Sequence, residues 1–257
     1  MMDPMTALRV GPGLVLLVGP TRSGKNTAAM AILQSLDLGP ISAATIEVKP
    51  RRALDGVQQT VVHDLDAQLP QLQRLMDLDT DLIYVRELSS GPLALCALES
   101  AISRRIISTL HTHNSTDALG RLTAMGLSPW LVVEAVRVVQ AQRWVRRLCP
   151  ECRRPTTIPG SVLGREGPTV AFEPVGCDAC RQTGYRGRRL VTERFALDHS
   201  PLGITIRRDF LNGIEGAVLH RAAREAGLVS LRDAAVALVL AGETSVAEAL
   251  QQTPAND

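Results

Sequence analysis

The chain has 257 residues, a formal net charge of +2 and 45% hydrophobic residues, which indicates a globular protein large enough to bury a core. Aromatic residues make up only 3%, so this core must be aliphatic. The near-neutral charge excludes a strong overall attraction to nucleic acid or membrane. The N-terminus lacks a signal peptide's basic and apolar regions, and no apolar run approaches the roughly 20 residues that span a bilayer. We therefore expect a cytoplasmic protein.

Strands and helices alternate through about the first 145 residues. Short apolar runs predict buried strands, and apolar residues at helical spacing predict the helices between them. In chain order we expect a strand at 14–18, a helix at 27–36, strands at 43–48 and 60–63, a helix at 65–77, a strand at 82–85, a helix at 93–103, a strand at 105–110, and helices at 114–125 and 131–145. This alternation is typical of a doubly wound α/β sheet.

The composition changes near residue 145. Residues 149–190 are rich in Cys, Pro, Gly and Arg and have little periodicity, which is typical of a loop-rich segment that needs a cross-link to hold it together. From Ser200 onward the pattern is helical, and helix starts are predicted at Pro201 and at two capping boxes, Ser230 with Asp233 and Ser245 with Glu248. We expect an α/β domain at 1–145, a cysteine-rich segment at 146–195 and a helical subdomain at 196–257.

A glycine-containing loop, "GPTRSGKNT", joins the first predicted strand to the first long predicted helix. The pattern Gly-x-x-x-x-Gly-Lys is that of a phosphate-binding loop. Its glycines let backbone N–H groups turn toward phosphate, the helix adds its N-terminal dipole, and the lysine neutralises charge. The predicted nucleotide-binding residues are Gly19, Pro20, Thr21, Arg22, Ser23, Gly24, Lys25, Asn26 and Thr27.

Asn26 departs from this pattern. The Ser or Thr hydroxyl at that position normally ligates Mg²⁺, whereas an amide oxygen lies on a longer side chain and must fit a tight octahedral shell. Thr27 cannot take over, because one step along a helix turns a side chain by about 100°. Arg22 is also unusual, and either binds phosphate or is solvated. We expect a weakened Mg²⁺ site.

Five further motifs follow the loop: "TIEVKP", "DTDLIYVRELSS", "STLHTHNSTDALGRL", "AQRWVRRLCPEC" and "GCDACRQTGYRGRR". In this order they resemble the type II secretion and type IV pilus assembly ATPases, whose patterns include "GPTGSGKTT" and "DPDVIMVGEIRD". The resemblance runs from about residue 10 to the C-terminus. It implies a RecA-like P-loop core that binds ATP, with a small tetracysteine zinc element and a helical C-terminal subdomain. It also implies a hexamer or mixed ring that acts on inner-membrane platform proteins in secretion or pilus assembly.

The resemblance also implies three catalytic residues. Glu87 matches the Walker B glutamate, which would polarise the attacking water. His111 matches the histidine of the His box, which would sense the γ-phosphate. Glu47 matches the first acid of an acidic box.

Other positions of these motifs differ from the family. The second acid of the box is Val48, the glycine before the Walker B glutamate is Arg86, and the Arg-Asp pair after it is Ser89 and Ser90. Each lost positioning or charged group is typically worth about 2–4 kcal/mol in the transition state. We expect weak hydrolysis or none, so a catalytically inactive, nucleotide-dependent scaffold or regulator stays open as an alternative.

Two CxxC pairs, Cys149 with Cys152 and Cys177 with Cys180, have 24 residues between them. This spacing predicts a structural Zn²⁺ site, because two knuckles supply four thiolates to one tetrahedral ion. A disulfide is disfavoured in a cytoplasmic protein.

An arginine-rich flank surrounds the cysteines: Arg146, Arg147, Arg153, Arg154, Arg186, Arg188 and Arg189. It raises a third hypothesis, a zinc-ribbon nucleic-acid binder. Because aromatic residues that could stack on bases are scarce, a solvated or subunit-contacting face is favoured over nucleic acid as the partner.

Overall fold

The computed structural model describes residues 2–37, 41–48, 50 and 53–254. The chain forms two compact units. The first comprises Met1–Ala141 and Arg194–Leu228, and the second comprises Gln142–Glu193 and Val229–Asp257. The sequence predicts three domains, with boundaries near 145 and 195. The division into compact units does not test these boundaries, which stay a prediction.

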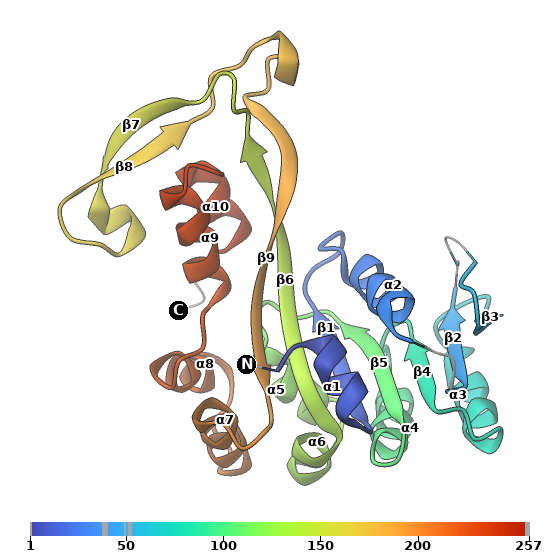
Figure 1. The fold of residues 1–257 in the computed structure, drawn as a ribbon. Coiled ribbons are helices and arrows are strands. Elements are labelled where there is room, and N and C mark those ends of the chain that lie inside the picture. Colours follow the sequence, from blue (N-terminus) through green and yellow to red (C-terminus); the bar gives the residue numbers. More distant parts are fainter. Residues whose placement is uncertain (1, 38–40, 49, 51–52, 255–257) are drawn as a thin grey trace. The chain divides into compact units, whose positions relative to one another are not determined.

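A seven-stranded sheet has the strand order β3-β2-β4-β5-β1-β6-β9 (Figure 1). Its strands are β1 (Gly13–Val18), β2 (Ala43–Glu47), β3 (Val57–Val61), β4 (Leu82–Val85), β5 (Arg105–Leu110), β6 (Val136–Leu148) and β9 (Tyr185–Ala196). Neighbouring strands from β3 through to β6 pair in parallel. This order requires crossovers between strands, so the predicted doubly wound α/β class is confirmed.

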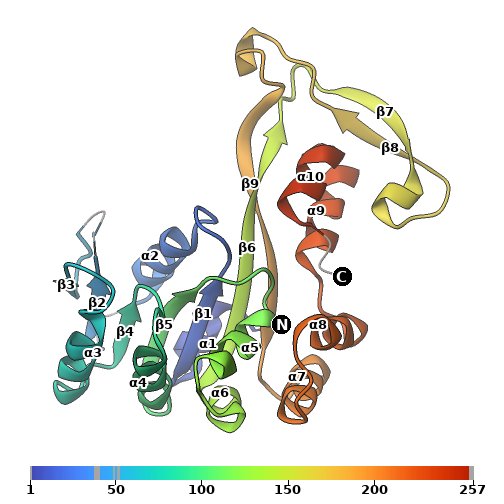
Figure 2. The ribbon, with the colours of Figure 1, turned by 180° about the vertical axis from the view of Figure 1, so that it is seen from behind.

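Helices cover both faces of this sheet in the first unit. On one face, α1 (Pro4–Val10) and α2 (Lys25–Ser35) contact β1 (Figure 1). On the other face lie α3 (Gln68–Asp77), α4 (Gly91–Ala101), α5 (Asp117–Ala124) and α6 (Pro129–Ala135) (Figure 2). Then α7 (Pro201–Leu211) contacts α6, and α8 (Gly216–Glu225) contacts α5. With helices on both sides, β1 is buried along its whole length, which explains its continuous apolar run.

The predicted helix at 131–145 is wrong over most of its length. The helix α6 ends at Ala135, and β6 begins at Val136 and pairs in parallel with β1. Its valines are β-branched and favour a strand. Most of β6 is buried on both faces, so the sequence shows no alternation and its apolar spacing also fits a helix. The third strand lies at Val57–Val61 rather than at the predicted 60–63.

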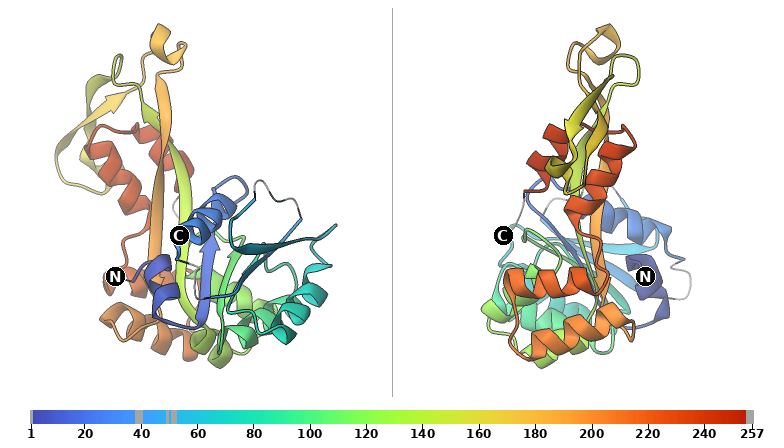
Figure 3. Two further views of the ribbon diagram at one scale, coloured as in Figure 1. Left: turned by 45° about the vertical axis from the view of Figure 1, so that its right-hand side comes forward. Right: turned by 90° about the vertical axis from the view of Figure 1, so that its left-hand side faces the viewer.

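The second unit contains an antiparallel hairpin of β7 (Arg154–Pro159) and β8 (Pro168–Glu173), with a 3₁₀ turn, η1 (Gly160–Leu163), between them. The helices α9 (Leu231–Leu240) and α10 (Val246–Gln252) pack against each other and contact β8 (Figure 3). A second 3₁₀ turn, η2 (Asp178–Cys180), precedes β9. The segment predicted to be loop-rich, 149–190, therefore contains regular strands.

The two predicted capping boxes differ. At α9, Ser230 and Asp233 exchange side-chain and backbone hydrogen bonds in both directions. At α10, the Ser245 hydroxyl accepts from the Glu248 amide, but the Glu248 carboxylate binds Arg146 instead. None of the helices in the described part of the chain is long and apolar enough to cross a membrane.

Candidate functional site

The predicted phosphate-binding loop follows β1 directly. Gly19 and Gly24 have positive φ angles of 147° and 92°, which glycine adopts without strain. The Ser23 amide donates to the Pro20 carbonyl oxygen at 3.2 Å, which closes a turn inside the loop. Gly24 is the N-cap of α2, so the loop ends where the positive end of the helix dipole begins.

Lys25 is buried at the start of α2. Its Nζ donates hydrogen bonds to the carbonyl oxygens of Gly19, at 2.6 Å, and Pro20, at 3.0 Å. The ammonium group therefore lies against the loop that is predicted to hold phosphate. A charge in this position can neutralise a polyphosphate bound by the same loop.

The three residues predicted to be catalytic come from neighbouring parallel strands. Glu47 is the last residue of β2, Glu87 lies two residues beyond β4, and His111 directly follows β5. The strands are in register, with Val18 opposite Leu110 at the ends of β1 and β5. All three residues therefore lie at the sheet edge that carries the loop, where ligands bind in open α/β sheets.

Glu87 and His111 contact each other. The distance between Glu87 Oε1 and His111 Nε2 is 3.4 Å, and both side chains are partly exposed. The buried Gln68 also bears on this site, because its Nε2 donates to the Glu87 carbonyl oxygen at 3.1 Å. Sequence reasoning missed Gln68, because nothing in the motifs links the start of α3 to the end of β4.

Glu47 has different partners. Its Oε1 accepts from Thr45 Oγ1 at 3.0 Å and from Gln59 Nε2 at 3.4 Å. These donors come from β2 itself and from the neighbouring β3. The Glu47 carboxylate is thus held by side chains of β2 and β3, whereas Glu87 and His111 form a separate pair.

Asn26 has a partner that the sequence does not reveal. The hydroxyl of Tyr84, in the middle of β4, donates to Asn26 Oδ1 at 3.2 Å. Tyr84 is fully buried. Burial, together with the nearby negative charge of Glu47, raises the pKa of Tyr84 above its ordinary value, so the hydroxyl stays protonated and donates.

The residues present do not fit the usual magnesium site of a phosphate-binding loop. A short hydroxyl would normally ligate the ion, but the oxygen available at this position belongs to Asn26 and is bound by Tyr84. The position of the second acid is occupied by Val48, which offers no ligand.

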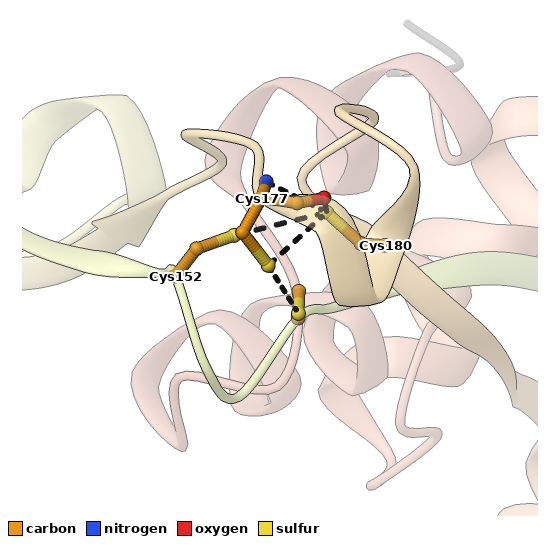
Figure 4. A group of neighbouring side chains, drawn as sticks. Cys152, Cys177 and Cys180 are labelled. Carbon is orange, nitrogen blue, oxygen red and sulfur yellow. Dashed lines mark hydrogen bonds between the residues drawn. The ribbon is translucent and has the colours of Figure 1, made fainter.

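The four cysteines of the two CxxC pairs come together, with their sulfur atoms all within 4.8 Å of one another. Figure 4 shows Cys152, Cys177 and Cys180 converging, and the Cys152–Cys180 and Cys177–Cys180 sulfur distances are 3.9 and 3.8 Å. A tetrahedral ion with Zn–S bonds of about 2.3 Å needs sulfurs about 3.8 Å apart. Disulfide sulfurs would lie at about 2.05 Å. The cluster therefore fits Zn²⁺ and contains no disulfide.

Backbone amides support the cysteine cluster. The Gly176 amide donates to Cys152 Sγ at 3.3 Å, and the Gly184 amide donates to Cys180 Sγ at 3.2 Å. Although burial opposes ionisation, the amides of Cys177 and Gly184 lower the pKa of Cys180 below its ordinary value. Such donors stabilise thiolate ligands, and four protein ligands form the closed shell of a structural metal site.

Several arginines of the arginine-rich flank are paired with acids in the second unit. Arg147 and Arg189 contact Glu243 at 3.7 and 2.8 Å, and Arg186 contacts Glu151 at 3.0 Å. Arg146 pairs with Glu248 at 2.6 Å. These pairs favour a structural role for the arginines over a continuous cationic surface.

A sheet in this order, parallel from β3 through to β6, with a Gly-x-x-x-x-Gly-Lys loop between its first strand and the next helix, defines a P-loop nucleotide-binding fold. Two solved structures share the fold. The ATPase DotB of Legionella pneumophila has a TM-score of 0.67 and 17% identity, over 95% of this chain and 61% of that one. The pilus retraction motor PilT with bound ADP also has a TM-score of 0.67 and 17% identity, over 99% and 65%.

The family is shown by the sequence match. Residues 3–251 match the family model described as "Type II/IV secretion system protein", and the chain belongs to this family. The type II secretion system protein HxcR of Pseudomonas aeruginosa is 33% identical over 250 residues, which cover 96% of this chain and 50% of that protein. The type IV pilus assembly ATPase PilB of Myxococcus xanthus is 30% identical over 253 residues, covering 94% and 44%. The chain thus spans about half the length of these relatives.

Proposed function

We propose that this chain binds ATP at residues 19–27 and couples binding, with slow hydrolysis, to protein secretion or pilus assembly. The observation that carries the proposal is the buried Lys25 folded against its own loop, at the sheet edge that also presents Glu87 and His111. A nucleotide on the loop would direct its terminal phosphate toward this edge. Family membership supports ATP as the nucleotide.

In the proposed chemistry, Glu87 accepts a proton from the attacking water and His111, 3.4 Å away, contacts the γ-phosphate. Lys25 neutralises charge on the phosphates. Glu47 is assigned an electrostatic role at most, because its carboxylate is already bonded to Thr45 and Gln59. Turnover is slow because Val48 replaces the second acid of the acidic box, and Ser89 and Ser90 replace the Arg-Asp pair.

Phosphate release from ATP, measured colorimetrically on the full chain, tests the hydrolytic part of the proposal. We expect release at least about a hundredfold below that of an intact motor, because each missing group is worth about 2–4 kcal/mol. Lys25→Ala and Glu87→Gln should abolish what remains. Robust release that depends on Lys25 would overturn the view of a slow enzyme.

A second candidate function is a nucleotide-dependent scaffold or regulator of such a machine. The hydrogen bond between Tyr84 and Asn26 favours it, because it engages the side chain at the position where P-loop motors carry their metal-binding hydroxyl. Nucleotide binding without Lys25-dependent phosphate release would select the scaffold over the slow ATPase.

For the rest of the assembly, we propose a homo-hexamer or mixed ring at the inner membrane that contacts platform proteins of a secretion or pilus system. Support comes from the family match, whose members include the relatives named above. We propose that the cysteine cluster binds Zn²⁺ as a structural ion, on the strength of its sulfur distances and its amide donors.

A further inference from the structure

Asn26 and Tyr84 are unusual residues that contact each other. They lie 58 positions apart in the chain, on α2 and β4, and their side chains share a hydrogen bond of 3.2 Å. In the family patterns quoted above, these two positions carry threonine and methionine. A methionine has no hydroxyl to donate, so this hydrogen bond depends on the tyrosine at position 84, and its acceptor here is the Asn26 amide oxygen.

The pair holds Asn26 away from metal ligation. The Tyr84 hydroxyl is buried, and it donates its hydrogen bond to Asn26 Oδ1. If Asn26 turned this oxygen toward a cation, the buried hydroxyl would lose its acceptor. The free-energy cost of leaving this buried donor unsatisfied would weaken the binding of a cation by Asn26 about tenfold or more.

Cationic side chains are available in place of a metal ion. Arg86 follows Tyr84 by two residues and is close enough to act electrostatically on its hydroxyl. Its backbone is fixed, because its amide donates to the Ile46 carbonyl oxygen at 3.2 Å and its carbonyl oxygen accepts from Thr109 Oγ1 at 2.5 Å. Arg22, within the loop, is exposed and has a φ of 67°. Arg22 and Lys25 in the phosphate-binding motif and Arg86 directly after β4 thus supply three cationic side chains.

We infer that this site binds a nucleoside triphosphate without a divalent cation. The Asn26–Tyr84 pair closes the magnesium position, and Lys25, Arg22 and Arg86 balance the phosphate charge. This inference rests on the proposed nucleotide binding and specifies its chemistry. It distinguishes this chain from P-loop proteins whose nucleotide arrives with its metal.

Titration of the full chain with a fluorescent N-methylanthraniloyl ATP, in excess magnesium chloride and in EDTA, tests the inference. The expected dissociation constants agree within about threefold. A dissociation constant that rises by about tenfold or more in EDTA would overturn metal independence while leaving nucleotide binding intact. The absence of binding in both buffers would overturn the proposed function, and with it the inference.

Restoring the family residues gives a second test. The double variant Asn26→Thr/Tyr84→Met should acquire magnesium dependence, with binding about tenfold tighter in magnesium than in EDTA. The matched control is Tyr185→Phe, which removes the chain's other tyrosine hydroxyl from its bond to Ser245 in the second unit and should leave both constants unchanged. A folded double variant that remains indifferent to magnesium would contradict the role assigned to the pair.

Discussion

Glu248 is a deeply buried acid of the second unit, with a side chain only 1% exposed in its ion pair with Arg146. It accepts hydrogen bonds from the Arg146 amide at 3.0 Å and from the Arg146 guanidinium Nε at 2.7 Å. The same guanidinium lies 4.0 Å from the centroid of the Tyr185 ring. One carboxylate therefore fixes both the backbone and the side chain of Arg146, and through it the packing of Tyr185.

Removal of this carboxylate should destabilise the second unit. We expect Glu248→Ala to lower the free energy of unfolding by about 2–3 kcal/mol, somewhat below the usual cost for a fully buried pair because Arg146 is half exposed. Urea denaturation followed by circular dichroism measures the change.

The matched control is Glu151→Ala, which breaks an exposed pair with Arg186 at 3.0 Å. An exposed pair contributes about 0.5 kcal/mol or less. Equal losses in the free energy of unfolding for the two variants would mean that the burial of Glu248 does not make its ion pair more stabilising than an exposed one.

At the scale of elements, the cysteine cluster joins two separate turns of the second unit. Cys149 and Cys152 follow β6, while Cys177 directly precedes η2 and Cys180 is its last residue, ahead of β9. Few side chains are buried along the intervening hairpin, where β7 and β8 show mostly exposed or half-buried residues. A bound metal would therefore supply much of the local stability.

Cys180→Ser should lose the zinc ion and loosen residues 149–190. We expect one zinc per chain in the unaltered protein by mass spectrometry of the metal, and much less in the variant. Limited proteolysis should then cut within 149–190. Cys96→Ser is the control, since Cys96 lies on α4 and contacts Met76 rather than the cluster. Full zinc retention in Cys180→Ser would contradict a four-cysteine site.

The elements also show how far sequence reasoning extends. The strand at Leu82–Val85 and the loop before α2 could be predicted, because a buried apolar run and a glycine motif are local signals. The strand β6 could not, because burial on both faces hides its period. The Tyr84–Asn26 bond depends on where α2 lies against β4, which no local pattern encodes.

At the scale of the whole molecule, the proposed ring predicts a mass that responds to nucleotide. The chain spans about half the length of its relatives, so assembly tests whether this portion carries the ring contacts. Multi-angle light scattering with a nonhydrolysable ATP analogue should show a mass about sixfold above that of the monomer if a homo-hexamer forms. A monomer mass with and without the analogue would contradict a ring made by this chain alone and favour the mixed ring.

Isothermal titration calorimetry of ATP into the folded full chain tests the central claim most directly, with Lys25→Ala and the exposed-residue control Arg74→Ala beside it. The loop should give measurable heat in the unaltered protein and in Arg74→Ala. Lys25→Ala should bind at least about tenfold more weakly, because it loses a charge-assisted contact to phosphate. Absence of heat from the unaltered protein, or unchanged affinity in Lys25→Ala, would contradict the account.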